Sequence, residues 1–168
     1  SLGGTTKYTS TCSRSRFNPY KTPIANAKNA GILTSAAAGN NAYTDGLALP
    51  ACSPDAVSVG AVYDSNIGGV TWSTSPNCTD SSTAADKVTC FSNSASFLTL
   101  LAPGANITAA GITQAGTSQA SPHVAALAAI LHSAYPNESV SELENRMITS
   151  GDIITDSRNG LEFPRINA

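Results

Sequence analysis

The chain has 168 residues and a formal net charge of −2, with only 12% charged and 6% aromatic residues. A protein that binds nucleic acid usually carries a basic excess to neutralise phosphates, so this charge balance argues against a nucleic-acid partner. No apolar run approaches the roughly 20 residues that cross a bilayer, so we expect no membrane span. The length fits one domain of ordinary size.

The first third of the sequence alternates helical and strand patterns. Thr22-Pro23 is typical of a helix start, and Gly31 is expected to end that helix. Two apolar segments, residues 32–38 and 56–62, predict buried strands, and the first of them ends at Gly39-Asn40. A helix, a glycine turn and buried strands in succession indicate an α/β fold.

The middle of the chain is expected to contain a long surface excursion, residues 63–90, followed by two more strands. Residues 97–101 and 106–109 predict these strands, with a turn at Pro103-Gly104 between them. An alanine-rich helix comes next and is expected to end at Tyr135-Pro136. Because this helix is apolar nearly all round, we expect it to lie inside the protein.

A last amphipathic helix is predicted from about residue 140 to residue 149. Ser139 is expected to cap it, with Glu142 completing a capping box, and Gly151 closes it. We find no internal repeat and no linker, so all of these elements are expected to belong to one layered unit.

The four cysteines suggest an oxidising compartment. Cys78 and Cys90 bracket one polar segment, so a local disulfide there is easy to close and would contribute roughly 3 kcal/mol. That pairing leaves Cys12 to bond with Cys52. A zinc site is a weaker alternative, because the chain has no Cys-x-x-Cys pair and neither histidine lies near a cysteine in sequence. Free buried thiols are a third interpretation.

Two interpretations fit the serine-rich segment before the long helix. Ser121 is a good N-cap and Pro122 a good first helical residue, in which case Ser118 is an ordinary loop serine. Alternatively, Ser118 stands at the helix start, where the dipole favours developing negative charge and Gly116 lets a substrate backbone approach. A serine hydroxyl so placed attacks a carbonyl if a base takes its proton. Ala120 breaks the Gly-x-Ser-x-Gly pattern and argues against an α/β-hydrolase elbow.

A resemblance to one family decides between these interpretations. Residues 116–125 read Gly-Thr-Ser-Gln-Ala-Ser-Pro-His-Val-Ala and resemble the nucleophile motif of the subtilisin-like serine proteases, the subtilases, which usually have methionine at the glutamine position. Other stretches resemble family motifs in the same order: residues 1–4, 36–40, 50 with 56–61, 91–94 with 101–104, and 159–160 with 165–168. The resemblance implies that residues 1–168 are the C-terminal portion of a single catalytic domain. It also implies a three-layer fold with a mainly parallel central sheet flanked by helices.

Carried over residue by residue, the resemblance implies Ser118 as the nucleophile and Asn40 as the side-chain donor of the oxyanion hole. Taken alone, Gly39-Asn40 also fits ordinary turn chemistry at a strand end. The resemblance further implies a substrate-binding set, which comprises Ser1, Leu2, Gly3, Ala37, Ala38, Gly39, Ala48 and Thr117. Their small side chains predict an open primary pocket for large apolar substrate side chains.

The acid and base of the catalytic triad have no counterpart in this sequence. The subtilase triad runs Asp, His, Ser along the chain, whereas His123 and His132 both follow Ser118. Neither histidine is therefore expected to be catalytic, and the Asp and His are expected on an N-terminal half of the same domain. The chain alone is expected to be inactive. The alternative is an inactive fragment or binding module that keeps the fold.

The resemblance implies a secreted serine endopeptidase that acts on protein or peptide substrates. It implies no essential cofactor and allows a structural calcium ion. Asp80 and Asp86 are of the residue type that binds a hard cation, but two separated aspartates are more often simply solvated.

Overall fold

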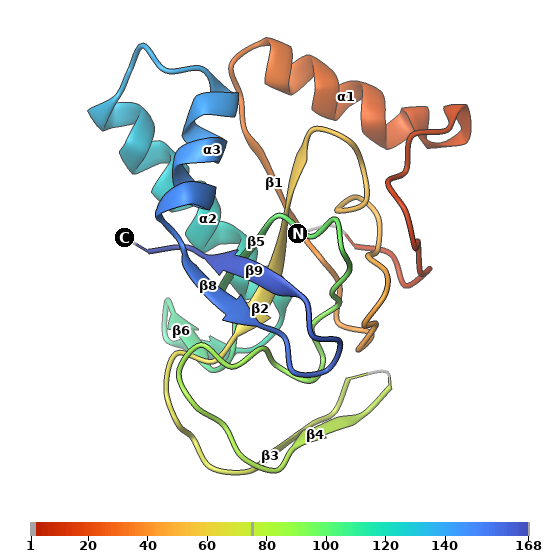
Figure 1. Ribbon diagram of the computed structural model, residues 1–168, viewed down its shortest axis with the longest axis vertical. Helices are drawn as coiled ribbons and strands as arrows, with labels where there is room; N and C mark the ends of the chain where they lie inside the picture. Colours follow the sequence, from red (N-terminus) through yellow and green to blue (C-terminus); the bar gives the residue numbers. More distant parts are fainter. Residues whose placement is uncertain (1–2, 75, 168) are drawn as a thin grey trace.

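A computed structural model describes residues 3–74 and 76–167 of the chain (Figure 1). The helices are η1 (Ser15–Phe17), α1 (Asn18–Asn29), α2 (Thr117–Ala134) and α3 (Val140–Ser150). The strands are β1 (Thr34–Ala37), β2 (Ala56–Val62), β3 (Val70–Trp72), β4 (Cys78–Asp80), β5 (Leu100–Pro103), β6 (Ile107–Ala109), β7 (Ile112–Gln114), β8 (Asp152–Thr155) and β9 (Glu162–Arg165).

A five-stranded sheet in the order β1-β2-β5-β9-β8 forms the centre of the fold. Its first four strands run parallel, and β8 pairs antiparallel with β9. The remaining strands form two separate hairpins, β3–β4 and β6–β7. The mainly parallel sheet with flanking helices confirms the predicted α/β class.

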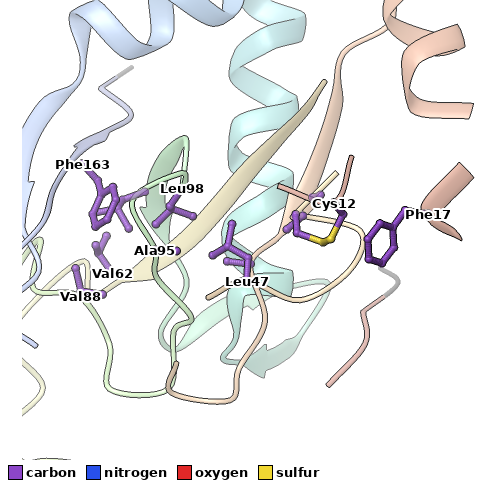
Figure 2. Packing of buried hydrophobic residues seen from close by; sticks show 13 residues of the cluster. Cys12, Phe17, Leu47, Val62, Val88, Ala95, Leu98 and Phe163 are labelled. Atoms are coloured by element: carbon purple, nitrogen blue, oxygen red, sulfur yellow. A yellow bond between two sulfur atoms is a disulfide. The ribbon is translucent and has the colours of Figure 1, made fainter. Parts of the chain in front are cut away.

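Buried side chains lie on both faces of the sheet because strand residues alternate in direction. On one face, Val57 and Val59 of β2 pack with Val124 of α2 and Met147 of α3. The opposite face carries a second cluster of buried residues from η1, the loops and the C-terminal strands (Figure 2). Its labelled members are Cys12, Phe17, Leu47, Val62, Val88, Ala95, Leu98 and Phe163.

The first helix starts earlier than the sequence predicts. α1 begins at Asn18, with Pro19 rather than Pro23 in its first turn, so the prediction of a start at Thr22-Pro23 is wrong. Pro23 instead lies inside the helix, which accommodates the missing backbone donor. The helix ends beside Gly31 (φ +78°), as expected for a glycine in the left-handed region.

Several strands differ from their predicted extents. The excursion over residues 63–90 contains a hairpin, β3–β4, and β6 pairs only with β7 instead of joining the main sheet. Pro103 is the last residue of β5 rather than part of a turn, because a proline at a strand end needs no ladder donor. β8 and β9 were not predicted, since four-residue strands leave little periodicity to detect.

Two helices confirm their predicted ends. α2 stops at Ala134 with Tyr135 as its C-cap, and the Ser139–Glu142 capping box opens α3. The prediction that α2 lies wholly inside is wrong for the described residues, because Ile130 on its outer face is 63% exposed. None of the helices in the described part of the chain is long and apolar enough to cross a membrane.

Both predicted disulfides are present. Cys12 bonds to Cys52 and Cys78 bonds to Cys90. The described residues contain no free cysteine, so the zinc and free-thiol alternatives are wrong.

Candidate active site

The serine segment enters α2 at its first turn. The helix begins at Thr117 and makes Ser118 its second residue, with Gly116 as the N-cap. Ser121 is therefore not the N-cap, and its hydroxyl lies 2.8 Å from that of Ser35 on β1. A Cβ on Gly116 (φ +152°) would lie only 3.0 Å from Asn40 Nδ2, so glycine suits both the backbone and the close approach. Ser118 thus stands in the first turn of α2, where the helix dipole favours negative charge.

Thr117 fixes the orientation of the Asn40 side chain. The backbone N–H and the hydroxyl of Thr117 both donate to Asn40 Oδ1, each at 2.9 Å. The Thr117 hydroxyl also accepts from Gly39 N at 3.1 Å. Only the carbonyl end of an amide can accept two donors, so the NH₂ end of Asn40 is turned toward Gly116. This arrangement makes Asn40 a hydrogen-bond donor beside the start of α2.

Asn93 holds the loop that carries Asn40, a role that the sequence analysis did not assign. Its side chain is fully buried, and its Oδ1 accepts from Asn41 N at 2.9 Å and Tyr43 N at 3.1 Å. Its Nδ2 donates to Ala38 O at 3.1 Å, and its backbone N–H donates to the carbonyl of Gly39 at 2.8 Å. The only signal in the sequence was its place in the motif over residues 91–94.

Three hollows meet at Ser118. The first, of about 410 Å³, is lined by Gly3, Gly4, Thr5, Ala37, Gly39, Asn40, Asn41, Thr74, Thr117 and Ser118. The second, of about 550 Å³, is lined by Ser35, Ala36, Ala37, Pro50, Ser118, Ser121, Pro122 and Ala125. The third, of about 540 Å³, lies between α2 and the β6–β7 hairpin. No aspartate or glutamate lines any of the three, as far as the described residues show.

The predicted substrate-binding residues fall into three groups. The first hollow brings together Gly3, Ala37, Gly39 and Thr117 beside the two predicted catalytic residues. Ala38 and Ala48 are fully buried and line none of the three hollows. Ala48 packs behind Gly39, where an added Cβ would come within 3.1 Å of the alanine methyl group. Ser1 and Leu2 lie outside the described residues.

Both histidines belong to α2. His123 Nδ1 lies 2.8 Å from the carbonyl oxygen of Gln119. A carbonyl only accepts hydrogen bonds, so Nδ1 carries the proton and the ring is held against its own helix. His132 is exposed near the end of the same helix.

Asp80 and Asp86 each have protein partners. Asp80 is buried, not solvated: it accepts from the Tyr63 hydroxyl at 2.7 Å and the Cys90 N–H at 2.8 Å, and it pairs with Lys87. Burial, helped by the nearby Asp80 carboxylate, raises the pKa of the Tyr63 phenol far above its usual value, so the phenol stays protonated as a donor. Asp86 pairs with Arg165 at 2.9 Å. The part of the chain that the structure describes contains no group of three or more acidic, His or Cys side chains suited to a metal ion.

Comparisons with known proteins place this chain in one family. The model of the Subtilase family matches residues 1–164. Subtilisin-like protease 2 of Arthroderma otae is 34% identical over 155 residues, which cover 87% of this chain and 32% of that protein. The protein of the same name from Trichophyton equinum is 33% identical over 155 residues, with the same shares of both chains.

A solved structure shares the fold. The crystal structure of a cold adapted subtilisin-like serine proteinase superposes with a TM-score of 0.71 at 24% identity, covering 99% of this chain and 53% of that one. This chain spans about a third of the length of the curated relatives it matches. With the family model aligned to nearly all of its residues, the chain belongs to the subtilase family of serine proteases.

Proposed function

We propose that this chain carries the nucleophile and the oxyanion hole of a serine endopeptidase. The observation that carries the proposal is the Asn40 amide, which Thr117 turns into a donor beside Ser118 at the start of α2. Residues 1–168 are then the C-terminal portion of one catalytic domain. The small residues around the first hollow support a pocket for a large apolar substrate side chain.

In this mechanism, Ser118 Oγ attacks the carbonyl carbon of the scissile peptide bond while a base takes the hydroxyl proton. The carbonyl oxygen becomes an oxyanion, which the Asn40 Nδ2 and the Ser118 N–H stabilise through hydrogen bonds. Collapse of the tetrahedral species releases the amine, to which the base returns the proton. Water then cleaves the acyl-serine by the same route and regenerates the enzyme.

The acid and base are proposed to lie on another portion of the same protein. No carboxylate lines the hollows at Ser118 among the described residues, and the His123 ring is bonded to its own helix. We therefore assign the catalytic Asp and His to an N-terminal half, which is this chain's partner. No cofactor has a role in this chemistry. The two disulfides support secretion to an oxidising, extracellular compartment.

Substitution of the two residues in the complete protease tests the proposal. Ser118→Ala is expected to abolish turnover. Asn40→Ala is expected to lower kcat by about 10²–10³-fold with KM little changed, which is the loss known for removal of the corresponding donor in subtilisin. Steady-state kinetics on a peptide substrate measure both effects. Turnover that survives Ser118→Ala would show that this serine is not the nucleophile.

A covalent probe separates the protease from an inactive module that keeps the fold. A fluorophosphonate reacts with an activated serine and is expected to label the complete protein at Ser118, as peptide mass spectrometry would show. The Ser118→Ala variant is the matched control and should stay unlabelled. An intact protein that resists labelling would favour the binding module.

A further inference from the structure

The β3–β4 hairpin contributes a residue to the hollow beside Ser118 that neither the sequence motifs nor the proposed mechanism uses. Thr74 follows β3 at the hairpin tip and lines the 410 Å³ hollow together with Gly3, Asn40 and Ser118. The hairpin belongs to the excursion over residues 63–90 and extends away from the main sheet below β2 (Figure 1). Through Thr74, this peripheral hairpin borders the reaction centre.

Side-chain and disulfide contacts hold the hairpin to the body of the protein. Cys78 on β4 is bonded to Cys90. The ring of Trp72, at the end of β3, packs edge-on against the ring of Phe91, with 5.3 Å between the ring centroids. The Trp72 indole N–H donates to the Tyr63 hydroxyl at 2.8 Å, which in turn donates to Asp80. Because Tyr63 is buried, this network holds both strands of the hairpin against the body of the protein, from the Trp72–Cys78 pair next to the tip to Asp80 at the base.

The same contacts link the hairpin to the loop of Asn40. Cys90 and Phe91 immediately precede the segment that contains Asn93, whose side chain holds that loop. Near the tip, the Thr74 hydroxyl donates to the carbonyl of Pro76 at 2.7 Å. Thr74, two residues beyond Trp72, lies in the lining of the same hollow as Asn40 and Ser118.

The hollow carries no charged side chain among its described lining residues. Thr74 is short and neutral, and among the described residues it is the one through which the hairpin lines this hollow. A group at this position would meet the part of the substrate that enters the hollow next to the scissile carbonyl. Any charge placed at residue 74 would act there without an opposing charge in the lining, so it would bias which substrate side chains are accepted.

We propose that the β3–β4 hairpin is a specificity-determining wall of the substrate pocket and that Thr74 is its contact residue. In the native protein, Thr74 favours uncharged substrate side chains at this subsite, since it offers no ionic partner. The inference rests on the proposed function, because it assumes that Ser118 attacks a peptide bond beside this hollow.

Charge substitution at residue 74 of the complete protease tests the wall. Matched peptides carry Lys, Gln or Glu at each position flanking the cleaved bond in turn, and kcat/KM is measured for each. At one position, Thr74→Asp is expected to raise the Lys-to-Glu ratio of kcat/KM about five- to tenfold, and Thr74→Lys to lower it by a similar factor. Because each ratio is taken on one preparation, any loss of folded enzyme cancels.

Ser81→Asp is the matched control, since it adds the same charge at an exposed position just beyond β4 and outside the hollow. It should leave the ratio unchanged. The proposal that Thr74 forms a specificity-determining wall would be overturned by either of two results. One is an equal Lys-to-Glu ratio of kcat/KM for the wild type and both Thr74 variants, and the other is a shift of that ratio in Ser81→Asp equal to the shift in Thr74→Asp. Either result can occur while Ser118→Ala still abolishes turnover, so the wall and the proposed function fail separately.

Discussion

Thr117 holds Asn40 through both its backbone and its side chain, and substitution can remove only the side-chain contact. Thr117→Val keeps the shape but deletes the hydroxyl that donates to Asn40 Oδ1 and accepts from Gly39 N. Loss of the hydrogen bond to Asn40, about 1–1.5 kcal/mol, is expected to lower kcat roughly tenfold. Thr117→Ser keeps the hydroxyl and is expected to retain most of the wild-type kcat. Steady-state kinetics of the complete protease give both values.

A double-mutant cycle shows whether this effect passes through Asn40. In an Asn40→Ala background, Thr117→Val should lower kcat no further, because the donor that it positions is already gone. Additive losses would mean that Thr117 acts on some other part of the site, such as the backbone of Gly39.

The functional roles of single residues can be predicted from the sequence when the residues lie within one motif. They are harder to predict when residues far apart in the chain come into contact only in the folded protein. Ser118 and Asn40 could each be proposed from their neighbours in the chain. Asn93 could not, because 52 residues separate it from Asn41 and only the packed loop brings its buried amide to that backbone. The role of Thr74 could not be predicted for the same reason, since it depends on where the tip of the β3–β4 hairpin lies in the folded protein.

The turn between β8 and β9 supports the segment that contains Asn93. Arg158 donates to the carbonyls of Cys90 at 2.9 Å and Ser92 at 2.7 Å, and it pairs with the buried Asp156. Asn159 donates to the Ser94 hydroxyl at 2.6 Å. Elements with clear periodicity, such as β2 and α3, could be predicted from sequence, whereas β8 and β9 depend on this docking and could not.

Stability is expected to depend on pH through Asp156. Burial alone would raise the pKa of its carboxyl, but hydrogen bonds and charge from Arg158 outweigh burial and hold the pKa below the ordinary value of 3.8. Because the pKa of Asp156 is lower in the folded than in the unfolded protein, the ionised carboxylate stabilises the fold at pH values above its unfolded-state pKa. This contribution is lost as the pH falls below about 4. Asp156→Asn is therefore expected to cost about 3–5 kcal/mol at pH 7, because it leaves Arg158 without its buried partner.

Urea unfolding at pH 7 and pH 3 measures this effect, with Ser118→Ala in the complete protein as the common background to prevent self-digestion. The difference in the free energy of unfolding between the protein with Asp156 and the Asp156→Asn variant should be smaller at pH 3 than at pH 7. Asp152→Asn, at the exposed start of β8, is the matched control and should change stability by no more than about 0.5 kcal/mol. A difference that is the same at both pH values would contradict the proposed role of the charged pair.

One side of the molecule exposes both a strand edge and apolar side chains. β1 is an edge strand of the sheet, and Ile32 just before it is 59% exposed. Beside it, the outer face of α2 leaves Ala125, Ala129 and Ile130 exposed, although the all-round apolar sequence predicts a buried helix. An unpaired strand edge next to an apolar helix face favours association with another part of a protein. The apolar face of α2 is therefore a candidate contact surface for the proposed N-terminal half.

We expect the outer edge of β1 and this face of α2 to bind the proposed N-terminal half, which supplies the acid and base. Residues 1–168 produced alone should therefore show no measurable peptidase activity, and fluorophosphonate should label Ser118 only slowly. Co-expression with the N-terminal portion of the protein should restore turnover and rapid labelling. Hydrogen exchange should also slow at the β1 amides that face away from β2, because they gain backbone partners.

The matched control is co-expression of the same N-terminal portion with the Ser118→Ala chain. That pair should show the same slowing of hydrogen exchange on β1 but no turnover, which separates assembly from catalysis. Robust cleavage by purified residues 1–168, absent from the Ser118→Ala preparation made in parallel, would contradict the expectation. It would require a base within these residues, and His123, which lines a hollow shared with Ser118, would then be the first to substitute.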